Sequence, residues 1–317
     1  MKIAHWTLKN GSGLHMVAEE LCTAERALGY DSVLQNSQLP SDIPGGMGRD
    51  IHVCHSHIPT PVIKAGGKIV WCGHGTPEHT INTAMLDHRT GKLGDSCMLN
   101  MYWLQHADAR VTFVERHQDI YQRMADKHTV INYVPLGINT DYWKIVPSKG
   151  KYIGNPSAIT AENSHFIKWA MDLCILWDWV IQEVPTATLH LQYIPQDQHR
   201  WFMPLIYRNG CAFASYISGV LTKPALRNAF VSCDYYINMV RYGDPNRVGM
   251  EAKASGCKVI SYRGNPYADY WLTEGDQRVI AQELIDIFTG KTPRRESLPT
   301  PNMTDTAKRM IQIYENC

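Results

Sequence analysis

The segment from residue 240 to residue 262 constrains the fold of this chain more than any other part of the sequence. It opens at the end of a short apolar run, which glycine, aspartate, proline and asparagine at positions 243–246 break. Good helix formers then occupy Val248–Ala254, Gly256 ends them, and a β-rich run follows at Lys258–Tyr262. The sequence therefore predicts a β-loop-α-β unit with a loop at the amino end of the helix.

The amino end of this predicted helix is suited to an anion. Unpaired backbone N–H groups and the positive end of the helix dipole meet there, so the loop can receive a diphosphate. Glu251 lies one turn into the helix, where its carboxylate can accept hydrogen bonds from the hydroxyl pair of a sugar, and Arg247 stands where a cation can meet phosphates. The plainer alternatives are a first-turn glutamate that only satisfies the helix dipole and a solvated loop arginine.

The residues Glu251–Ile260 resemble the carboxyl-terminal half of GT-B glycosyltransferases, and among them the large retaining family usually called GT4. That family carries a first Glu, a glycine-rich stretch and then E-A-(small)-A-x-G-x-P-V-I. The run E-A-K-A-S-G-C-K-V-I in this chain fits the second part closely. The position of the first Glu falls on Gly243. Asp244 lies one place later, where it either replaces that Glu through a shifted backbone or is an ordinary turn residue of D-P-N.

The first half of the chain predicts a second Rossmann-like unit. Met1–Leu8 is expected to be a strand, followed by a glycine-bearing turn, a helix that Gly29 ends and a second strand at Asp31–Gln35. Gly11 and Gly13 in the turn allow a close approach of the backbone to a ligand. A tight turn without a ligand is equally consistent with G-S-G, because the third glycine of a dinucleotide fingerprint is absent.

Further β-rich runs in the first half predict a parallel sheet with ligand chemistry at the carboxyl ends of its strands. They lie at residues 50–57, 68–77, 109–114 and 129–135. The resemblance to the GT4 family extends over them, through histidines at the end of the first run, H-G-T at the end of the second and P-L-G-I-N-T-D after the fourth. Glu115 takes the place of a family Ser, and Leu136 that of a family Asn.

His74, in H-G-T-P, ends a predicted strand of the first half and is expected to face the cleft between the two halves. The resemblance implies a contact with the donor sugar, because the similar histidine of the family makes one. A lone histidine is otherwise most often a hydrogen-bonded core or surface residue. A metal site is not expected, because His52, His55 and His57 do not all point to one face of a strand and no carboxylate is fixed nearby.

The composition is that of a soluble globular protein, with 44% hydrophobic and 19% charged residues. A formal net charge of +1 excludes a strong overall field for polyanions, although a local basic face stays compatible with it. The nine cysteines form no C-x-x-C pair, which favours a reducing, cytoplasmic location. No signal peptide is expected, because a strand begins at once, and no transmembrane helix, because no run of about eighteen apolar residues occurs.

Three parts are expected along the chain. Residues 1–147 form an amino-terminal Rossmann-like domain on the acceptor side, and residues 148–300 form a carboxyl-terminal Rossmann-like domain for the nucleotide sugar. Residues 301–317 form a helix that packs back on the first domain, as is common in GT-B proteins.

The family usually supplies an Arg and a Lys from the loop after the first strand of the second domain. That loop is expected at residues 154–162, which contain no base, so Arg247 and the helix amides are expected to stabilise a diphosphate leaving group instead.

The resemblance implies an α/β protein of the GT-B class, with two Rossmann-like domains facing each other across a cleft. The expected activity is transfer of a sugar from a nucleotide-sugar donor to a hydroxyl acceptor, with retention at the anomeric carbon and without a metal or another cofactor. The predicted catalytic residues are His74 and Asp244, which hold the sugar. The predicted donor-binding residues are Glu251, Arg247, Gly11, Gly13, Gly243, Asn246 and Val248.

The acceptor stays open between a glycan, a lipid and a hydroxymethylated DNA base, and peripheral contact with a membrane is compatible with the sequence. Residues 79–105 mix methionine and aromatic residues with basic ones, so they are expected either to form acceptor loops or to be an ordinary, partly buried helix. Two other classes remain. One is a catalytically silent GT-B protein that binds a nucleotide or a partner, which the missing basic pair and first Glu favour. The other, more distant, is a nicotinamide dehydrogenase.

Overall fold

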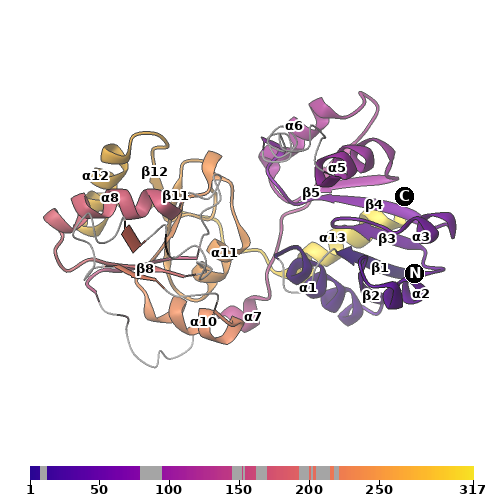
Figure 1. Cartoon of the computed structure of the whole chain (residues 1–317), viewed down its shortest axis with the longest axis horizontal. Helices are drawn as coiled ribbons and strands as arrows, with labels where there is room; N and C mark the ends of the chain where they lie inside the picture. The colour runs from indigo at the N-terminus through magenta and orange to yellow at the C-terminus, as the bar shows by residue number, and fades with distance from the viewer. Residues whose placement is uncertain are drawn as a thin grey trace. The chain divides into compact units, whose positions relative to one another are not determined.

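The computed structural model describes residues 1–7, 13–78, 95–144, 152, 154–161, 170–192, 200, 203–204, 215–217 and 221–317. The chain divides into two compact units (Figure 1). The first consists of Met1–Asn139 together with Pro301–Cys317, and the second of Thr140–Thr300. Each unit has its own sheet and its own hydrophobic core.

The first unit is built on a parallel sheet with the strand order β2-β1-β3-β4-β5-β6. Its strands are β1 (Lys2–Thr7), β2 (Asp31–Asn36), β3 (Ile51–Cys54), β4 (Lys68–Gly73), β5 (Ala109–Thr112) and β6 (Ile131–Tyr133). Its helices are α1 (Gly13–Ala27), α2 (Ile43–Gly46), α3 (Thr60–Lys64), α5 (Asp95–His106), α6 (Glu115–Met124) and α13 (Met303–Glu315). The Rossmann-like unit predicted for the first half is therefore confirmed.

Alternate residues of these strands bury opposite faces of the sheet. Ile3 of β1 and Val53 of β3 belong to a core cluster with α1 and α13. Ala4, Trp6 and Cys54 belong to a second cluster with α3, α5 and α6. Because helices cover both faces of the sheet, the strands consist of nearly continuous apolar residues. These apolar runs allowed the strands to be predicted from the sequence.

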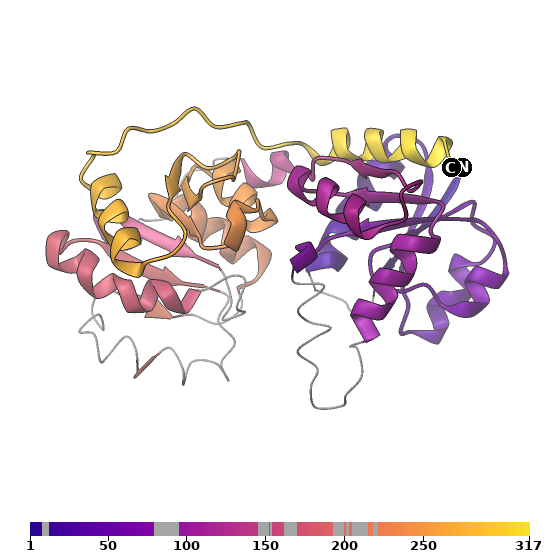
Figure 2. The ribbon, with the colours of Figure 1, turned by 90° about the horizontal axis from the view of Figure 1, so that it is seen from above.

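The carboxyl-terminal helix α13 is part of the first unit, and Figure 2 shows it lying along that unit in yellow. Its apolar side contributes Met303, Ala307, Met310, Ile311 and Tyr314 to the core. Two hydrogen bonds of 2.8 Å fix its start: the Thr306 hydroxyl accepts from the backbone N–H of Gly137 and donates to the carbonyl of Pro135. A Cβ at Gly137 would lie 2.3 Å from the backbone of Asn302, so a glycine is required at this crossing.

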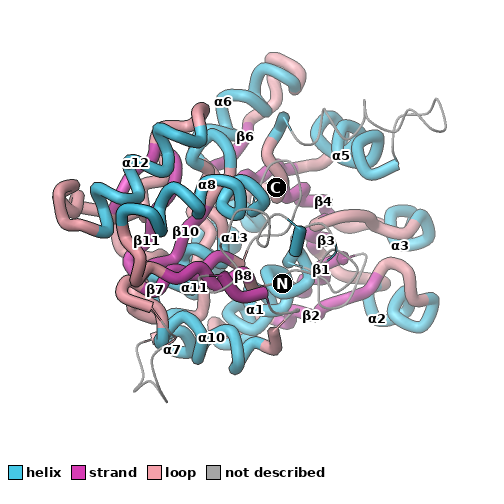
Figure 3. Tube along the Cα trace, turned by 60° about the vertical axis from the view of Figure 1, so that its left-hand side comes forward, coloured by secondary structure: helices cyan, strands magenta, loops and turns pink. Residues whose placement is uncertain are grey.

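The second unit is built on a parallel sheet with the strand order β12-β11-β10-β7-β8-β9. Its strands are β7 (Ser157–Thr160), β8 (Thr188–Leu191), β9 (Ser215–Ile217), β10 (Tyr235–Asn238), β11 (Lys258–Tyr262) and β12 (Tyr270–Leu272). Its helices include α7 (Thr140–Trp143), α8 (Ala170–Glu183), α10 (Lys223–Ser232), α11 (Arg247–Ala254) and α12 (Gln277–Phe288), and several of them can be followed in Figure 3. The β-loop-α-β unit predicted at residues 240–262 is confirmed as β10, α11 and β11.

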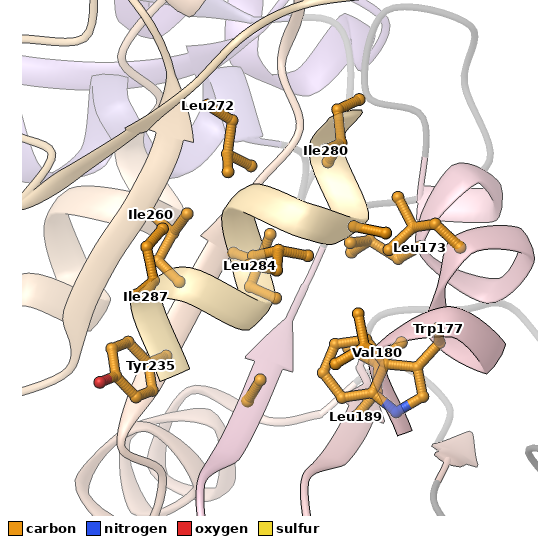
Figure 4. Close-up of a cluster of buried hydrophobic side chains, with 14 of the residues drawn as sticks. Leu173, Trp177, Val180, Leu189, Tyr235, Ile260, Leu272, Ile280, Leu284 and Ile287 are labelled. Carbon is orange, nitrogen blue, oxygen red and sulfur yellow. The ribbon is translucent and has the colours of Figure 1, made fainter. Parts of the chain in front are cut away.

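Helices cover both faces of this second sheet. On one face, α8 and α12 pack on the strands through Trp177, Val180 and Leu284, which Figure 4 shows beside Leu189 and Ile260. On the other face, the ring of Phe230 from α10 meets those of Tyr236 from β10 and Trp143 from α7 at centroid distances of 5.7 and 6.0 Å. This second packing joins α10 and α7 to the sheet.

Two expectations about the second half were wrong in detail. The boundary between the units falls after Asn139, eight residues earlier than expected, because α7 packs into the second unit: Trp143 is fully buried there and its carbonyl accepts a 2.9 Å hydrogen bond from the hydroxyl of Ser255. The first strand of the second sheet is Ser157–Thr160. Residues 154–160 of the expected loop are therefore a strand and its lead-in. Residues 162–169, among them Lys168, lie outside the described residues.

Two global properties complete the description. Within the described ranges, no helix is long and apolar enough to cross a bilayer. The cysteines there are free thiols: Cys22, Cys54, Cys72, Cys174, Cys233, Cys257 and Cys317.

Candidate functional site

The candidate site lies where β10 of the second unit ends and α11 begins. After Asn238 the chain forms a short 3-10 turn (Arg241–Gly243) and reaches α11 at Arg247. Asn246 caps the helix, because its side-chain oxygen accepts a 2.7 Å hydrogen bond from the N–H of Gly249. The predicted donor-binding role of Asn246 remains a prediction, whereas its structural role is to direct the first turn of α11 into the loop.

The loop before α11 is held in an unusual backbone conformation. Tyr242 and Gly243 have φ values of 63° and 64°, in the left-handed region. A Cβ on Gly243 would lie 2.2 Å from the carbonyl oxygen of Arg263, so this position accepts only glycine without a backbone shift. The N–H of Tyr242 donates a 2.9 Å hydrogen bond to Glu274. These contacts give the loop one shape, with Asp244 buried at its end.

Glu251 and Arg247 form a buried ion pair on the first turns of α11. The Nε of Arg247 donates to Oε1 of Glu251 at 2.6 Å, and their side chains are 10% and 3% exposed. The spacing of four residues places the two groups on one face of the helix. The sequence singled out both residues for separate contacts with ribose and phosphate, and the structure brings them together as one pair.

Two buried polar atoms at the neighbouring strand ends were missed by the sequence reasoning. Nδ2 of Asn238 and Oγ1 of Thr160 have no hydrogen-bond partner among the described residues, and both residues are fully buried. They end β10 and β7, which pair through Tyr236 and Ile159. A buried donor without a partner costs roughly 1–3 kcal/mol. Polar residues at the carboxyl ends of apolar strands were the available sequence signal for these groups, which suit a polar ligand.

The remaining predicted donor contacts are Val248, Gly13 and Gly11. Val248 is the second residue of α11 and is half-buried. Gly13 is the first residue of α1 in the first unit, where an added Cβ would meet nothing within 4 Å, so packing does not require a glycine there. Gly11 lies outside the described residues, as do residues 79–94 of the expected acceptor segment. Residues 95–105 of that segment lie in helix α5.

His74 follows β4 of the first unit, as predicted. Its Nε2 lies 2.6 Å from Nδ1 of His55, and the ring contacts Phe113 at a centroid distance of 4.8 Å. Burial lowers the pKa of His74 to about 3, so the imidazole is neutral at pH 7. His74 therefore cannot act as a cation in this structure, and its other nitrogen has no hydrogen bond to a described residue.

His55, Cys72 and His74 place one potential ligand atom each within 4.8 Å of one another. The two imidazole nitrogens are only 2.6 Å apart. Ligands at about 2.0–2.1 Å from a tetrahedral zinc ion lie roughly 3.3 Å from each other, so this separation fits a shared proton better than a shared metal. Burial also raises the pKa of the Cys72 thiol well above its ordinary value, which keeps it protonated.

Two parallel sheets of six strands, each covered by helices on both faces, and a final helix that returns to the first unit define the GT-B fold. The chain has this fold, as the sequence predicted.

Solved structures of glycosyltransferases share the fold. HepE from Anabaena in complex with UDP and glucose matches 100% of this chain with 98% of its own, at a TM-score of 0.62 and 14% identity. Sucrose-phosphate synthase from Thermosynechococcus elongatus covers the same shares at a TM-score of 0.72 and 12% identity. AviGT4, a glycosyltransferase involved in avilamycin A biosynthesis, matches 100% of this chain with 97% of its own, at a TM-score of 0.65 and 12% identity. No family model and no curated protein sequence matches the chain.

Proposed function

We propose that this protein is a glycosyltransferase that takes a sugar from a nucleotide-sugar donor and transfers it to a hydroxyl acceptor. The observation that carries the proposal is the buried Arg247–Glu251 pair on the first turns of α11. Nδ2 of Asn238, which has no partner among the described residues, lies 3.6 Å from the Cβ position of Gly249 on the same turns. A carboxylate, a guanidinium and a helix amino end together match the ribose and the diphosphate of a nucleotide. The fold supports the proposal, since HepE, which shares it, was solved with UDP and with UDP-glucose.

Each residue has a defined part in the proposed donor site. Glu251 accepts hydrogen bonds from the ribose hydroxyls, with its orientation fixed by Arg247. Arg247 and the first amides of α11, including that of Val248, stabilise the diphosphate as charge develops on it. Asp244, buried at the end of the loop, and His74 of the first unit hold the transferred sugar. Gly243 allows the loop shape that these contacts need.

Retention at the anomeric carbon and catalysis without a metal are part of the proposal. They are supported by the resemblance of Glu251–Ile260 to the retaining GT4 family. A glycan, a lipid and a hydroxymethylated DNA base are the acceptor classes to be compared, and a cytoplasmic location is proposed from the cysteine content. A DNA acceptor requires a salt-sensitive basic surface, because phosphate contacts release counterions.

The donor site is tested by replacing Glu251 with Gln, which keeps the side-chain volume and removes the charge. Loss of a charge-assisted hydrogen bond costs about 1.5–3 kcal/mol, so the affinity for UDP should fall about tenfold to a hundredfold in calorimetric titrations. Asp119→Asn is the matched control, because Asp119 forms an ion pair with Arg123 at the same spacing but is 71% exposed. UDP affinity that is unchanged in Glu251→Gln would falsify this placement of the ribose.

Transfer is tested separately from binding. The nucleotide sugar that raises the melting temperature most is incubated with each acceptor class, and mass spectrometry measures the addition of one sugar. The stereochemistry of the product, read by NMR at the anomeric proton, tests retention. A protein that binds UDP tightly but neither hydrolyses the donor nor glycosylates any acceptor is the catalytically silent alternative.

A further inference from the structure

A line of hydrogen-bonded histidines runs from a partly exposed residue into the core of the first unit. Nε2 of His74 lies 2.6 Å from Nδ1 of His55, and Nε2 of His55 lies 2.9 Å from Nδ1 of His5. Nε2 of His5 then lies 2.8 Å from Oε2 of Glu25 on α1. His5 and Glu25 are fully buried and His55 is 4% exposed. A polar line of this length inside an apolar core is costly unless every member is satisfied.

The inner end of the line is a carboxylate surrounded by donors. The hydroxyl of Ser32 donates to Oε2 of Glu25 at 2.6 Å, and the phenol of Tyr314 donates to Oε1 at 3.0 Å. Burial, together with the nearby Glu25, raises the pKa of Tyr314 well above its ordinary value, so the phenol keeps its proton and donates. An ionised carboxylate only accepts hydrogen bonds. His5 must therefore donate to Glu25 through Nε2.

The direction of this first bond fixes every other proton in the line. A neutral imidazole carries one N–H, so His5 with a proton on Nε2 accepts at Nδ1. His55 then donates from Nε2 and accepts at Nδ1, and His74 in turn donates from Nε2. Burial, and secondarily the neighbouring His74 and His5, lower the pKa of His55 well below its ordinary value, which keeps the central imidazole neutral. The outcome is a lone pair on Nδ1 of His74.

We propose that Glu25, His5 and His55 are positioning residues that hold His74 in the tautomer with a proton on Nε2. His74 thereby presents Nδ1 as a hydrogen-bond acceptor, and the ligand group that fits it is a hydroxyl. This inference deepens the proposed function, on which the identity of the ligand as a sugar rests, but the tautomer itself does not depend on that function. Tyr314 of α13 donates to the other oxygen of the same carboxylate, Oε1, and not to the one that His5 contacts.

The tautomer is measured without any ligand, by two-dimensional NMR of protein with ¹⁵N-labelled histidine side chains. The chain has fourteen histidines, and a His74→Asn variant identifies the signals of His74 by their loss. We expect Nε2 of His74 to carry the proton and Nδ1 to show the shift of an unprotonated nitrogen. A proton on Nδ1 of His74 in the wild-type protein overturns the proposal. A stoichiometric zinc ion in the purified protein, measured by mass spectrometry, overturns it as well, because the lone pairs would then point at the metal.

The role of Glu25 is tested with Glu25→Gln, in which an amide can donate as well as accept. We expect the single tautomer of His74 to be replaced by a mixture, while Tyr314→Phe keeps it, because His5 bonds to Oε2 and the phenol to Oε1. A single unchanged tautomer in Glu25→Gln overturns the proposal. Near-ultraviolet circular dichroism of both variants shows whether the core remains folded, and the wild-type spectrum decides the tautomer even if a variant does not fold.

A second measurement separates the positioning role from the proposed function. If the protein transfers sugar, Glu25→Gln should lower kcat about tenfold or more while the affinity for UDP is unchanged, because the line lies in the first unit and the nucleotide contacts in the second. An unchanged kcat overturns the role in catalysis. If no nucleotide sugar binds to the wild-type protein but the tautomer is as expected, the proposed function fails and the hydrogen-bonded line stands.

Discussion

Asp269 is the buried carboxylate that ties the site-bearing helix to the rest of the second unit. It is fully buried, and its Oδ2 accepts a 2.8 Å hydrogen bond from the backbone N–H of Val259. Its Oδ1 accepts from the guanidinium of Arg294 at 2.7 Å and from the hydroxyl of Ser297 at 3.0 Å, and lies 3.7 Å from Nζ of Lys253 on α11. We therefore predict that Asp269→Asn destabilises the second unit and loosens α11.

The size of the effect follows from the donors around the carboxylate. An amide NH₂ group in place of either oxygen faces N–H or O–H donors, whichever way the side chain is turned. Breaking a buried charged pair by changing one partner costs about 3–5 kcal/mol, and the partial exposure of Arg294 places the expected loss near 3 kcal/mol. For a unit of this size, a loss of about 3 kcal/mol lowers the melting temperature by roughly 6–12 °C.

The pH dependence provides a second signature of Asp269. Burial acts to raise its pKa, but the hydrogen bonds from Val259 and Arg294 and the charge of Lys253 hold the pKa below its ordinary value. A carboxyl whose pKa is lower in the folded state stabilises the protein above its unfolded pKa of about 3.9 and loses this contribution as the pH falls through the folded value. The difference in stability between wild type and Asp269→Asn should therefore be constant from pH 6 to pH 8 and shrink below about pH 4.

The assay is differential scanning calorimetry of the full chain, because the two units can unfold in separate transitions. Asp286→Asn is the control, since Asp286 is a partly exposed carboxylate paired with Lys291 at 3.6 Å, and it should change stability by less than about 0.5 kcal/mol. An Asp269→Asn protein that melts within 2 °C of wild type at pH 7 would refute the reasoning, by about the margin that surface substitutions show.

Two further substitutions test the loop and the start of α11. Gly243→Ala should destabilise the second unit by on the order of 2 kcal/mol, because φ is 64° and the new Cβ would meet the carbonyl of Arg263. It should also weaken UDP binding in thermal-shift assays. A variant that melts and binds UDP like the wild type would contradict this. Asn246→Ala should cost about 1 kcal/mol in urea unfolding through loss of the cap on Gly249, and Asn246→Asp should recover most of it; equal loss in both variants would argue against the cap.

The donor half of the site could be predicted from the sequence because its parts are adjacent in the chain. Loop, helix start and following strand lie within residues 240–262, and each has a local signal in glycine, proline or β-branched composition. The pairing of Arg247 with Glu251 was also within reach, since residues four apart on a helix meet. The position of β7, in contrast, could not be predicted from the sequence. The sequence runs 151–154 and 157–160 are both short and partly apolar, and pairing with β8 and β10 is what identifies Ser157–Thr160 as the strand.

Asp269 shows the opposite limit of sequence reasoning. It is a polar residue that follows the strand β11, a place where a side chain can meet a ligand, but its carboxylate accepts hydrogen bonds from Val259, Arg294 and Ser297 instead. Arg294 and Ser297 belong to residues 291–301, which form neither a helix nor a strand. A segment without helix or strand thus supplies hydrogen-bond donors that give Asp269 a structural role. No local sequence pattern predicts that contact.

The histidine line follows from strand order, which the sequence does not state. His5 lies opposite Val53 in the parallel pairing of β1 with β3, and His55 is two residues beyond Val53, so both point to the same face of the sheet. Val53 lies opposite Val70 in the pairing of β3 with β4. His74 is four residues beyond Val70, so it lies on the same face as well. Each histidine is thus a diagonal neighbour of the next, one step further along the adjacent strand. Because α1 packs on this face, the carboxylate of Glu25 on α1 can fix the protons of all three rings, so the tautomer of the partly exposed His74 depends on residues of several elements of the first unit.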